Sequence, residues 1–259
     1  MENTNFAGLL ESALSEPGKL SECYSQFWNY SMGNQLLAMQ QCSARKIQLG
    51  PISTFVGWKE KGRFVKKGEK AIVLCMPVTG KRKAEDEEGN ETEVGFTRFI
   101  YKANWFVAAQ SDGDAVQPQP IPGFSFERAL TALEIAKVEF AMLNGNCQGY
   151  AQKREIAINP IADHPERTMA HEIAHVILGH TAELMSDNGE RTPSDIRELE
   201  AEATSMLVCA SLDLAGIEES RGYIQSWYKG NKVPEASAKR IFHAADQILK
   251  AGREEKAVS

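Results

Sequence analysis

Long hydrophobic runs are missing from this 259-residue sequence, and so are cysteines at metal-binding spacing. No stretch of 18 apolar residues occurs, so we expect no transmembrane helix and no membrane partner. The opening residues, Met1 to Thr4, lack the basic and apolar regions of a signal peptide, which favours a cytoplasmic protein. The five cysteines are scattered without a C-x-x-C pair, which indicates free thiols and excludes a cysteine-based zinc site.

Histidine is scarce too, and two of the five histidines belong to one H-E-x-x-H motif, His171 to His175. The surrounding run, Thr168 to Leu178, is largely apolar and contains no glycine or proline, which predicts a helix. Positions i and i+4 share one face of a helix, so both imidazoles can bind one Zn²⁺. Glu172 between them would accept a proton from water as the catalytic base. The motif therefore predicts a zinc-dependent hydrolase, with a peptidase as the leading interpretation.

A third protein ligand is expected, because hydrolytic zinc usually takes three protein ligands and one water. His180 lies five residues after His175, about 140° around a helix, so we expect it to cap the helix end or line the cleft. Glu198 is the better candidate, in a second helix that we expect to begin at Ser194 or Asp195. Glu202 shares its face and would accept the N–H of a ligating histidine. Glu200 should face elsewhere.

Charge is distributed unevenly around a net value of −6. Residues 43–83 carry eleven Lys or Arg and two Glu, a local charge of +9, whereas residues 117–259 carry −6. The proline- and glycine-rich stretch 111–123 reads as a linker between them. We therefore expect an N-terminal domain over residues 1–116, whose basic surface suits polyanions, and an acidic C-terminal domain over residues 117–259.

The periodicities predict an α+β fold: a small α+β N-terminal domain, then a mainly helical domain with a short sheet. The order helix, strand, metal helix and glutamate helix is the one expected of a zinc peptidase core. In the first half the expected elements are a helix over 22–41, strands over 54–58, 71–78 and 94–109, and a hairpin turn at Gly89-Asn90. In the second half they are helices over 126–143, 165–179, 195–214, 218–228 and 234–251, and a strand over 155–159 that could hold a peptide by strand addition.

The segment from residue 58 to residue 70 mixes cations, aromatics and glycines. Lysine and arginine can follow a phosphate backbone while aromatic rings stack on bases, although such a turn is commonly just solvated and its tryptophan can belong to the core. The candidate DNA-binding residues are Trp58, Lys59, Lys61, Arg63, Phe64, Lys66, Lys67 and Lys70.

Both halves contain short motifs that occur in the same order in one known family. They are Phe27-Trp28-Asn29-Tyr30-Ser31 with Asn34, Trp58, Val65-Lys66-Lys67-Gly68-Glu69-Lys70, Ile156-Ala157-Ile158-Asn159-Pro160, His171-Glu172-Ile173-Ala174-His175, Gly179-His180-Thr181, and Glu198 with Ala201-Glu202. Together these motifs resemble the ArdC-type antirestriction proteins. The resemblance implies a domain that binds single-stranded DNA followed by a zincin-like metallopeptidase domain, with a role in protecting incoming DNA from restriction.

Two functions of different class follow. One is a zinc endopeptidase with one Zn²⁺ per chain, or another divalent metal, acting on an unidentified protein substrate. The other is a DNA-binding antirestriction shield whose metal only stiffens the C-terminal domain. An intact Glu172 favours the enzyme, because a structural site needs no base. The group that stabilises the oxyanion stays open among Tyr150, Tyr223, His180 and His243.

Overall fold

The computed structural model describes residues 5–15, 18–85, 91–116, 120–141, 146–181, 193–228 and 232–254. Two compact units make up the chain: residues 1–32 with 119–259, and residues 33–118. We expected one boundary, at residue 116. The contacts divide the chain between residues 118 and 119 and again after residue 32, because the first two helices pack with the C-terminal segment.

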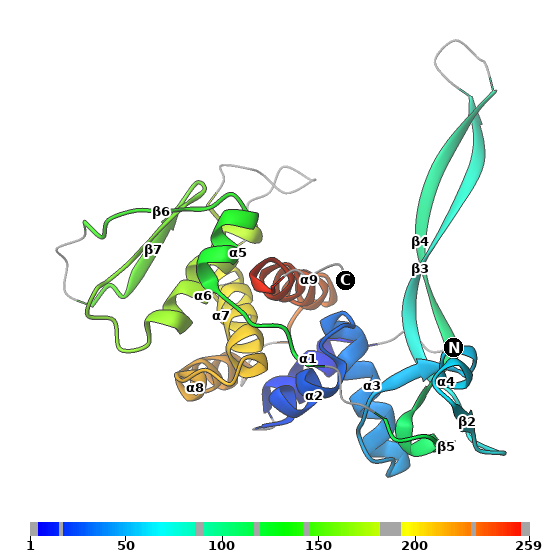
Figure 1. The fold of residues 1–259 in the computed structure, drawn as a ribbon. Helices are drawn as coiled ribbons and strands as arrows, with labels where there is room; N and C mark the ends of the chain where they lie inside the picture. The colour runs from blue at the N-terminus through cyan, green and yellow to red at the C-terminus, as the bar shows by residue number, and fades with distance from the viewer. Residues whose placement is uncertain are drawn as a thin grey trace. The chain divides into compact units, whose positions relative to one another are not determined.

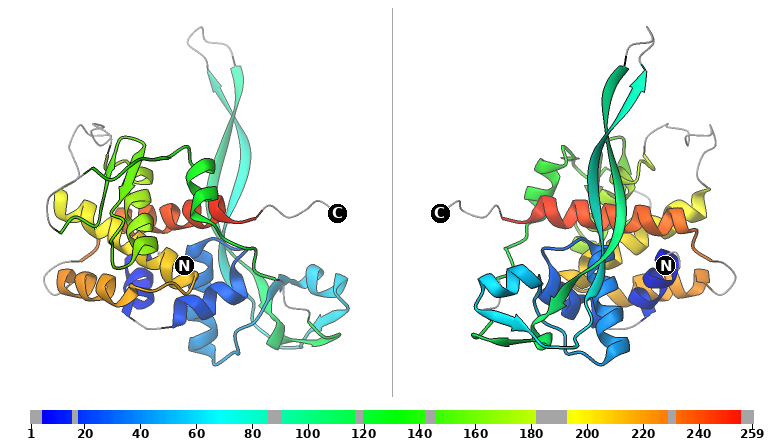
Figure 2. Two further views of the ribbon diagram at one scale, coloured as in Figure 1. Left: turned by 60° about the vertical axis from the view of Figure 1, so that its left-hand side comes forward. Right: turned by 90° about the vertical axis from the view of Figure 1, so that its right-hand side faces the viewer.

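The first unit is mainly helical. Figures 1 and 2 show its helices α1 (Phe6–Ser15), α2 (Lys19–Phe27), α5 (Phe126–Ala132), α6 (Pro165–Ile177), α7 (Ser194–Ser211), α8 (Ile217–Tyr228) and α9 (Glu235–Gly252). α7 is buried without interruption from Leu199 to Ser211 and packs against α2, α6, α8 and α9. Its sequence has no glycine or proline, as a fully surrounded helix requires.

The C-terminal helices lie where the sequence predicted them, within a few residues at each end. α7 begins at Ser194 as expected, but Pro193 holds the N-cap position and no side chain caps the helix. The Ser205 hydroxyl of α7 instead donates to the Arg167 carbonyl of α6 at 3.0 Å. This bond fixes how α7 lies along α6, and so where its glutamates meet the histidines.

A three-stranded sheet completes this unit. Its strands are β6 (Ala136–Lys137), β7 (Gly149–Gln152) and β8 (Glu155–Ile158), in the order β6-β8-β7. β8 pairs with β6 in parallel and with β7 antiparallel, so both of its sides are occupied. The prediction that this strand holds a peptide by strand addition is therefore wrong for β8. β7 and β8 both pack against α6.

The predicted helix over 126–143 is also wrong, because α5 ends at Ala132. The Ser125 hydroxyl caps its start, and the chain turns at Glu134, where φ is +54°. β6 follows, with the Val138 N–H donating to the Ile156 carbonyl at 2.9 Å. Pairing with β8 outweighs the helical periodicity of this stretch.

The second unit combines helices with a long β-ribbon. Its elements are α3 (Met32–Arg45), β1 (Ile52–Thr54), α4 (Phe55–Glu60), β2 (Arg63–Val65), β3 (Ile72–Glu85), β4 (Glu91–Val107), η1 (Ala108–Gln110) and β5 (Ser111–Gly113). Figure 1 shows β3 and β4 as a twisted two-stranded ribbon, and β1 extends the sheet on the other side of β4. The predicted turn at Gly89-Asn90 lies outside the described residues. Both predicted strands of the ribbon are confirmed and are longer than expected.

Two predictions in this half are wrong. The helix expected over 22–41 is broken into α2 and α3 at residues 28–31. The strand expected over 54–58 is a helix, α4, because the Thr54 hydroxyl accepts the Gly57 N–H at 3.0 Å and starts the turn. Short apolar runs fit either element, and here the capping residue decides.

The first unit thus holds α-helices on a small sheet, and the second holds a ribbon with short helices, which confirms the α+β class. Among the described residues, none of the helices combines the length and apolar character needed to cross a membrane.

Candidate metal centre

α6 and α7 bring His171, His175 and Glu198 together, as the sequence predicted. The two histidine Nε2 atoms lie 3.0 Å apart, and Glu198 Oε2 lies 3.6 Å from each of them. Ligands bound to one Zn²⁺ at about 2.0–2.1 Å in tetrahedral geometry stand about 3.3 Å apart. The donor set and the triangle therefore fit one divalent cation. Within the described part of the chain this is the group of His, Cys, Asp or Glu side chains that meets such a geometry.

The electrostatics of the cluster match a cation site. Burial opposes protonation of His171, but its contacts with Glu198 and Glu202 outweigh that effect and raise its pKa to about 9. Hydrogen bonds from His171 and His175 hold the pKa of Glu198 well below its usual range. The site thus attracts positive charge, which is a proton at one imidazole when no metal is bound.

Glu172 lies on the same helix, and its side chain is buried. Burial raises the pKa of this carboxyl, while the two neighbouring histidines oppose the shift. β7 passes directly beside it: a Cβ added at Gly149 would stand 3.2 Å from Glu172 Cγ and 2.7 Å from Thr168 Cγ2. Sequence reasoning missed Gly149, whose lack of a side chain lets the strand approach the base.

Glu202 lies behind His171, as predicted. Its Oε2 is 2.8 Å from His171 Nδ1, and its other oxygen accepts a hydrogen bond from Arg167. Burial acts to raise the pKa of Glu202, but His171, Ser220 and Arg167 lower it to about 2. An ionised Glu202 can hold the Nδ1 proton of His171, which leaves Nε2 free for a metal.

His180 and Glu200 form a second contact that the sequence did not reveal. His175 Nδ1 lies 3.1 Å from His180 Nδ1, and His180 Nε2 lies 2.9 Å from Glu200 Oε2. Both side chains are almost fully buried. Glu200 faces away from the cluster, as its helical position required, but toward His180 rather than solvent. Burial is the main cause that lowers the pKa of His180, although Glu200 opposes the shift.

The oxyanion candidates separate in the structure. His180 has both ring nitrogens engaged, so it does not line the cleft as one alternative expected. His243 is exposed on α9, and Tyr150 packs on Phe140 with ring centroids 5.8 Å apart. Tyr223 of α8 is 44% exposed, and its pKa is raised by burial and by the charges of Glu198 and Glu202. Of the four candidates, Tyr223 is thus the one whose pKa is raised by the carboxylates of the cluster.

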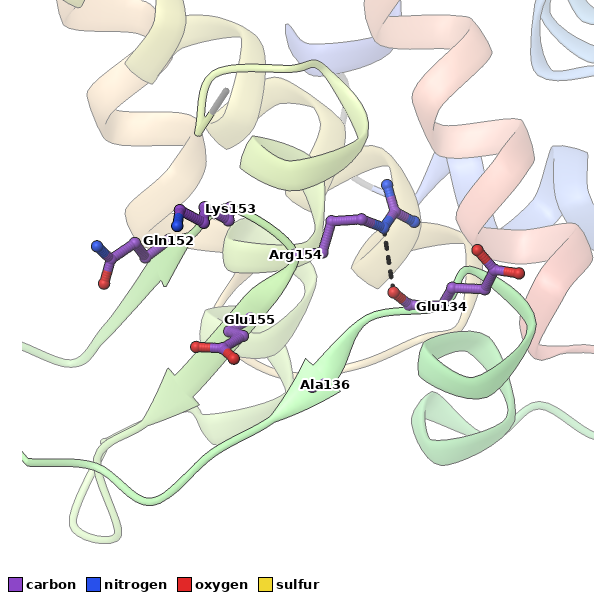
Figure 3. A pocket seen from close by; sticks show the side chains of 6 residues that line it. All are labelled: Glu134, Ala136, Gln152, Lys153, Arg154 and Glu155. Carbon is purple, nitrogen blue, oxygen red and sulfur yellow. Dashed lines mark hydrogen bonds between the residues drawn. The ribbon is translucent and has the colours of Figure 1, made fainter. Parts of the chain in front are cut away.

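Another pocket opens at the end of the small sheet. Figure 3 shows the residues that line it: Glu134, Ala136, Gln152, Lys153, Arg154 and Glu155. Arg154 donates to the Glu134 carbonyl at 3.1 Å, so this arginine stabilises the turn between α5 and β6. None of the predicted site residues belongs to this pocket.

The predicted DNA-binding residues divide into core and surface. Trp58 is fully buried and donates to the Phe106 carbonyl at 2.8 Å, so its predicted stacking on bases is wrong. Arg63 bonds Ser111 and backbone carbonyls, and Lys66 donates to the Ala109 carbonyl at 3.0 Å. The exposed members are Lys59, Lys61, Phe64, Lys66, Lys67 and Lys70.

Two family models match different parts of the chain. Residues 12–105 match the family model of the N-terminal domain of anti-restriction factor ArdC, and residues 135–214 match the peptidase M78 family, described as the IrrE N-terminal-like domain. No curated protein matches the sequence. The second match contains both metal-site helices, α6 and α7, in full.

Two solved structures of the antirestriction ArdC protein from R388 plasmid share the fold. The metal-free structure aligns with a TM-score of 0.54 at 22% identity over 96% of this chain and 95% of that one. The Mn(II)-bound structure gives 0.53 at 21% identity over 95% and 97%. The two domain matches and this common fold confirm the resemblance to ArdC-type antirestriction proteins.

Proposed function

We propose that this protein is a zinc-dependent metallopeptidase coupled to a domain that binds single-stranded DNA, with an antirestriction-type role in protecting incoming DNA. The observation that carries the peptidase is the triangle of His171, His175 and Glu198 beside a buried Glu172. One Zn²⁺ per chain suits two imidazoles and a carboxylate, and Mn²⁺ is the alternative, since the related ArdC protein binds Mn(II).

Each residue of the site has a defined task in hydrolysis of a peptide bond. The metal, when bound, supplies Lewis acidity toward the scissile carbonyl and the attacking water. Glu172 takes a proton from that water and passes it to the leaving amine, and its raised pKa suits both transfers. Tyr223 donates its hydroxyl hydrogen to the developing oxyanion.

β7 is the element that would hold the protein substrate. It lies against α6 at Gly149, next to Glu172, and pairs with β8 on one side. An extended peptide added along β7 would bring its backbone past the base. This corrects the strand-addition site from β8 to β7. The substrate itself is a protein segment that can become extended.

Single-stranded DNA is proposed to bind the second unit through its exposed lysines. Lys59, Lys67 and Lys70 are exposed around α4 and β2, and Phe64 is 61% exposed among them. Phe55 of α4, which sequence reasoning did not select, is 54% exposed. Lysines neutralise phosphates and phenyl rings stack on unpaired bases without sequence preference.

The alternative is a non-proteolytic DNA-binding shield with a structural metal. Structural zinc sites are closed by four protein ligands. Here three ligands converge, Glu198 is half-exposed, and a buried carboxyl with a raised pKa lies alongside. These features favour hydrolysis over a structural role.

Metal analysis and a cleavage assay test the proposal together. The wild type should bind about one divalent ion, and His171→Ala should lose it. Glu172→Gln should keep the metal and lose cleavage of an unfolded protein such as casein, because only the proton acceptor is removed. Glu166→Gln, an exposed glutamate on the same helix, is the matched control and should cleave normally. Cleavage by Glu172→Gln at the wild-type rate would leave the shield as the better interpretation.

A further inference from the structure

The two histidines of the metal site are held from behind in different ways. His171 Nδ1 meets a carboxylate directly, at 2.8 Å from Glu202. His175 Nδ1 instead meets a third imidazole, His180, at 3.1 Å, and only that ring reaches a carboxylate, Glu200, at 2.9 Å. The second arrangement extends one residue further and connects α6 with α7 and α9.

The backbone places His180 for this contact. Gly179 has φ +75°, a left-handed conformation that ends the helix, and the His180 N–H then donates to the His175 carbonyl at 2.9 Å. Arg240 of α9 donates to the Leu178 carbonyl at 2.6 Å and lies 3.4 Å from Glu200 Oε2. Hydrogen bonds to α6 and to Arg240 of α9 thus fix the turn after α6.

Proton positions follow from the chemistry of these groups. With the Glu200 oxygen as acceptor in the 2.9 Å contact, His180 Nε2 is the donor. His180 Nδ1 is then the acceptor in the 3.1 Å contact with His175, and His175 Nδ1 is the donor. The lone pair of His175 is left on Nε2, the atom that faces His171 and Glu198.

We propose that His180 and Glu200 are positioning residues that fix the tautomer and the ring orientation of His175 for metal binding, with Arg240 holding the Glu200 carboxylate. The proposal rests on the metal site proposed above. His180 acts through His175 and does not itself contact the metal or the substrate.

Substitutions at His180 separate this role from simple packing. His180→Leu fills the space but removes both hydrogen bonds, so divalent-metal affinity should fall about 10–100-fold, the usual effect of losing a partner of a ligand. His180→Gln keeps an acceptor and a donor and should restore most of the affinity. Affinity for Mn²⁺ is measured from the electron paramagnetic resonance signal of free Mn²⁺, and for Zn²⁺ by competition with a chelator.

Three further variants complete the experiment. His164→Leu is the matched control. His164, at the start of α6, also contacts a glutamate, Glu219 at 3.2 Å, but it does not contact the residues of the metal site. It should bind metal as the wild type does.

Glu200→Gln should reduce the divalent-metal affinity by an intermediate amount. If a thermal scan shows that metal-free His180→Leu does not fold, the affinity of Glu200→Gln serves as the test instead. His175→Ala tests the metal site itself.

The outcomes are distinct. Rescue by glutamine but not by leucine supports the positioning role. Wild-type affinity in His180→Leu, or in Glu200→Gln where the leucine variant does not fold, overturns it, and so do equal losses in the leucine and glutamine variants. Equal binding by the wild type and His175→Ala would instead show that the proposed metal site is wrong.

Discussion

Four glutamates around the metal centre show how surroundings assign different tasks to one residue type. Glu198 is half-exposed and its pKa is lowered by two histidines, which suits a ligand. Glu172 is buried with a raised pKa, which suits a base. Glu202 is kept ionised by His171 and its other partners, and Glu200 is buried against His180. The helical positions of Glu198 and Glu202 were readable from sequence; the burial that separates their tasks was not.

The site was predictable where its residues lie on one helix face. Both ligating histidines and Glu198 follow from i, i+4 spacing and from an acidic helix start. The contact between His180 and Glu200 joins residues 20 apart across two helices, and Arg240 comes from a third. No local spacing encodes such a contact, so only the packed structure reveals it.

At the same scale, Asp246 should make stability depend on pH. Burial raises its pKa to about 6, although the Met32 N–H and Arg253 oppose the shift. A carboxyl whose pKa is raised on folding binds more protons in the folded state, so the free energy of unfolding falls as pH rises from about 4 to about 6. The loss is complete above that range and amounts to about 3 kcal/mol at most.

Asp246→Asn isolates this effect, because an amide oxygen can still accept the Met32 N–H. The variant should gain stability relative to the wild type as pH rises from about 4 to about 6, and the difference should then stay constant. Urea unfolding of both proteins across this range measures it. A difference that does not change with pH would show that Asp246 is ionised in the folded protein throughout.

Among the elements, the long amphipathic helices were predictable and the short ones were not. α8 and α9 each present an apolar face over several turns, and their bounds match the predictions within a few residues. Phe55 to Glu60 has too few residues to show a period, so Thr54 as N-cap and the docking of Trp58 decide its form. Tertiary pairing likewise converts the residues after α5 into β6.

Trp58 should therefore behave as a core residue of the α4 element. Trp58→Ala removes a fully buried indole and its bond to the Phe106 carbonyl, and should destabilise the second unit by about 3–5 kcal/mol. Denaturant unfolding monitored by tryptophan fluorescence and circular dichroism measures the loss. If Trp58→Ala keeps wild-type stability while DNA affinity falls, the indole contacts DNA and its buried position is not the relevant one.

For the whole molecule, each unit has its own core, and the two proposed activities reside in different units. The metal site draws its described contacts from elements of the first unit, whereas the exposed lysines and Phe64 belong to the second unit. If each core maintains its own site, then removing one activity should leave the other in place. Such independence would also mean that DNA binding does not require the metal.

The prediction is a double dissociation in the full-length protein. Removing the metal with a chelator should abolish cleavage and leave the affinity for single-stranded DNA unchanged.

Replacing Lys59, Lys67 and Lys70 with Glu should weaken DNA binding at every sequence and flatten its salt dependence, because phosphate contacts release counterions. The same variant should keep its metal affinity. Replacing Lys232, Lys239 and Lys250 with Glu, three exposed changes in the first unit, is the control with the same change in net charge. Fluorescence anisotropy with labelled oligonucleotides at several salt concentrations measures DNA binding. Loss of DNA affinity on chelation would reject independent units, because the metal would then be needed to form the DNA-binding surface.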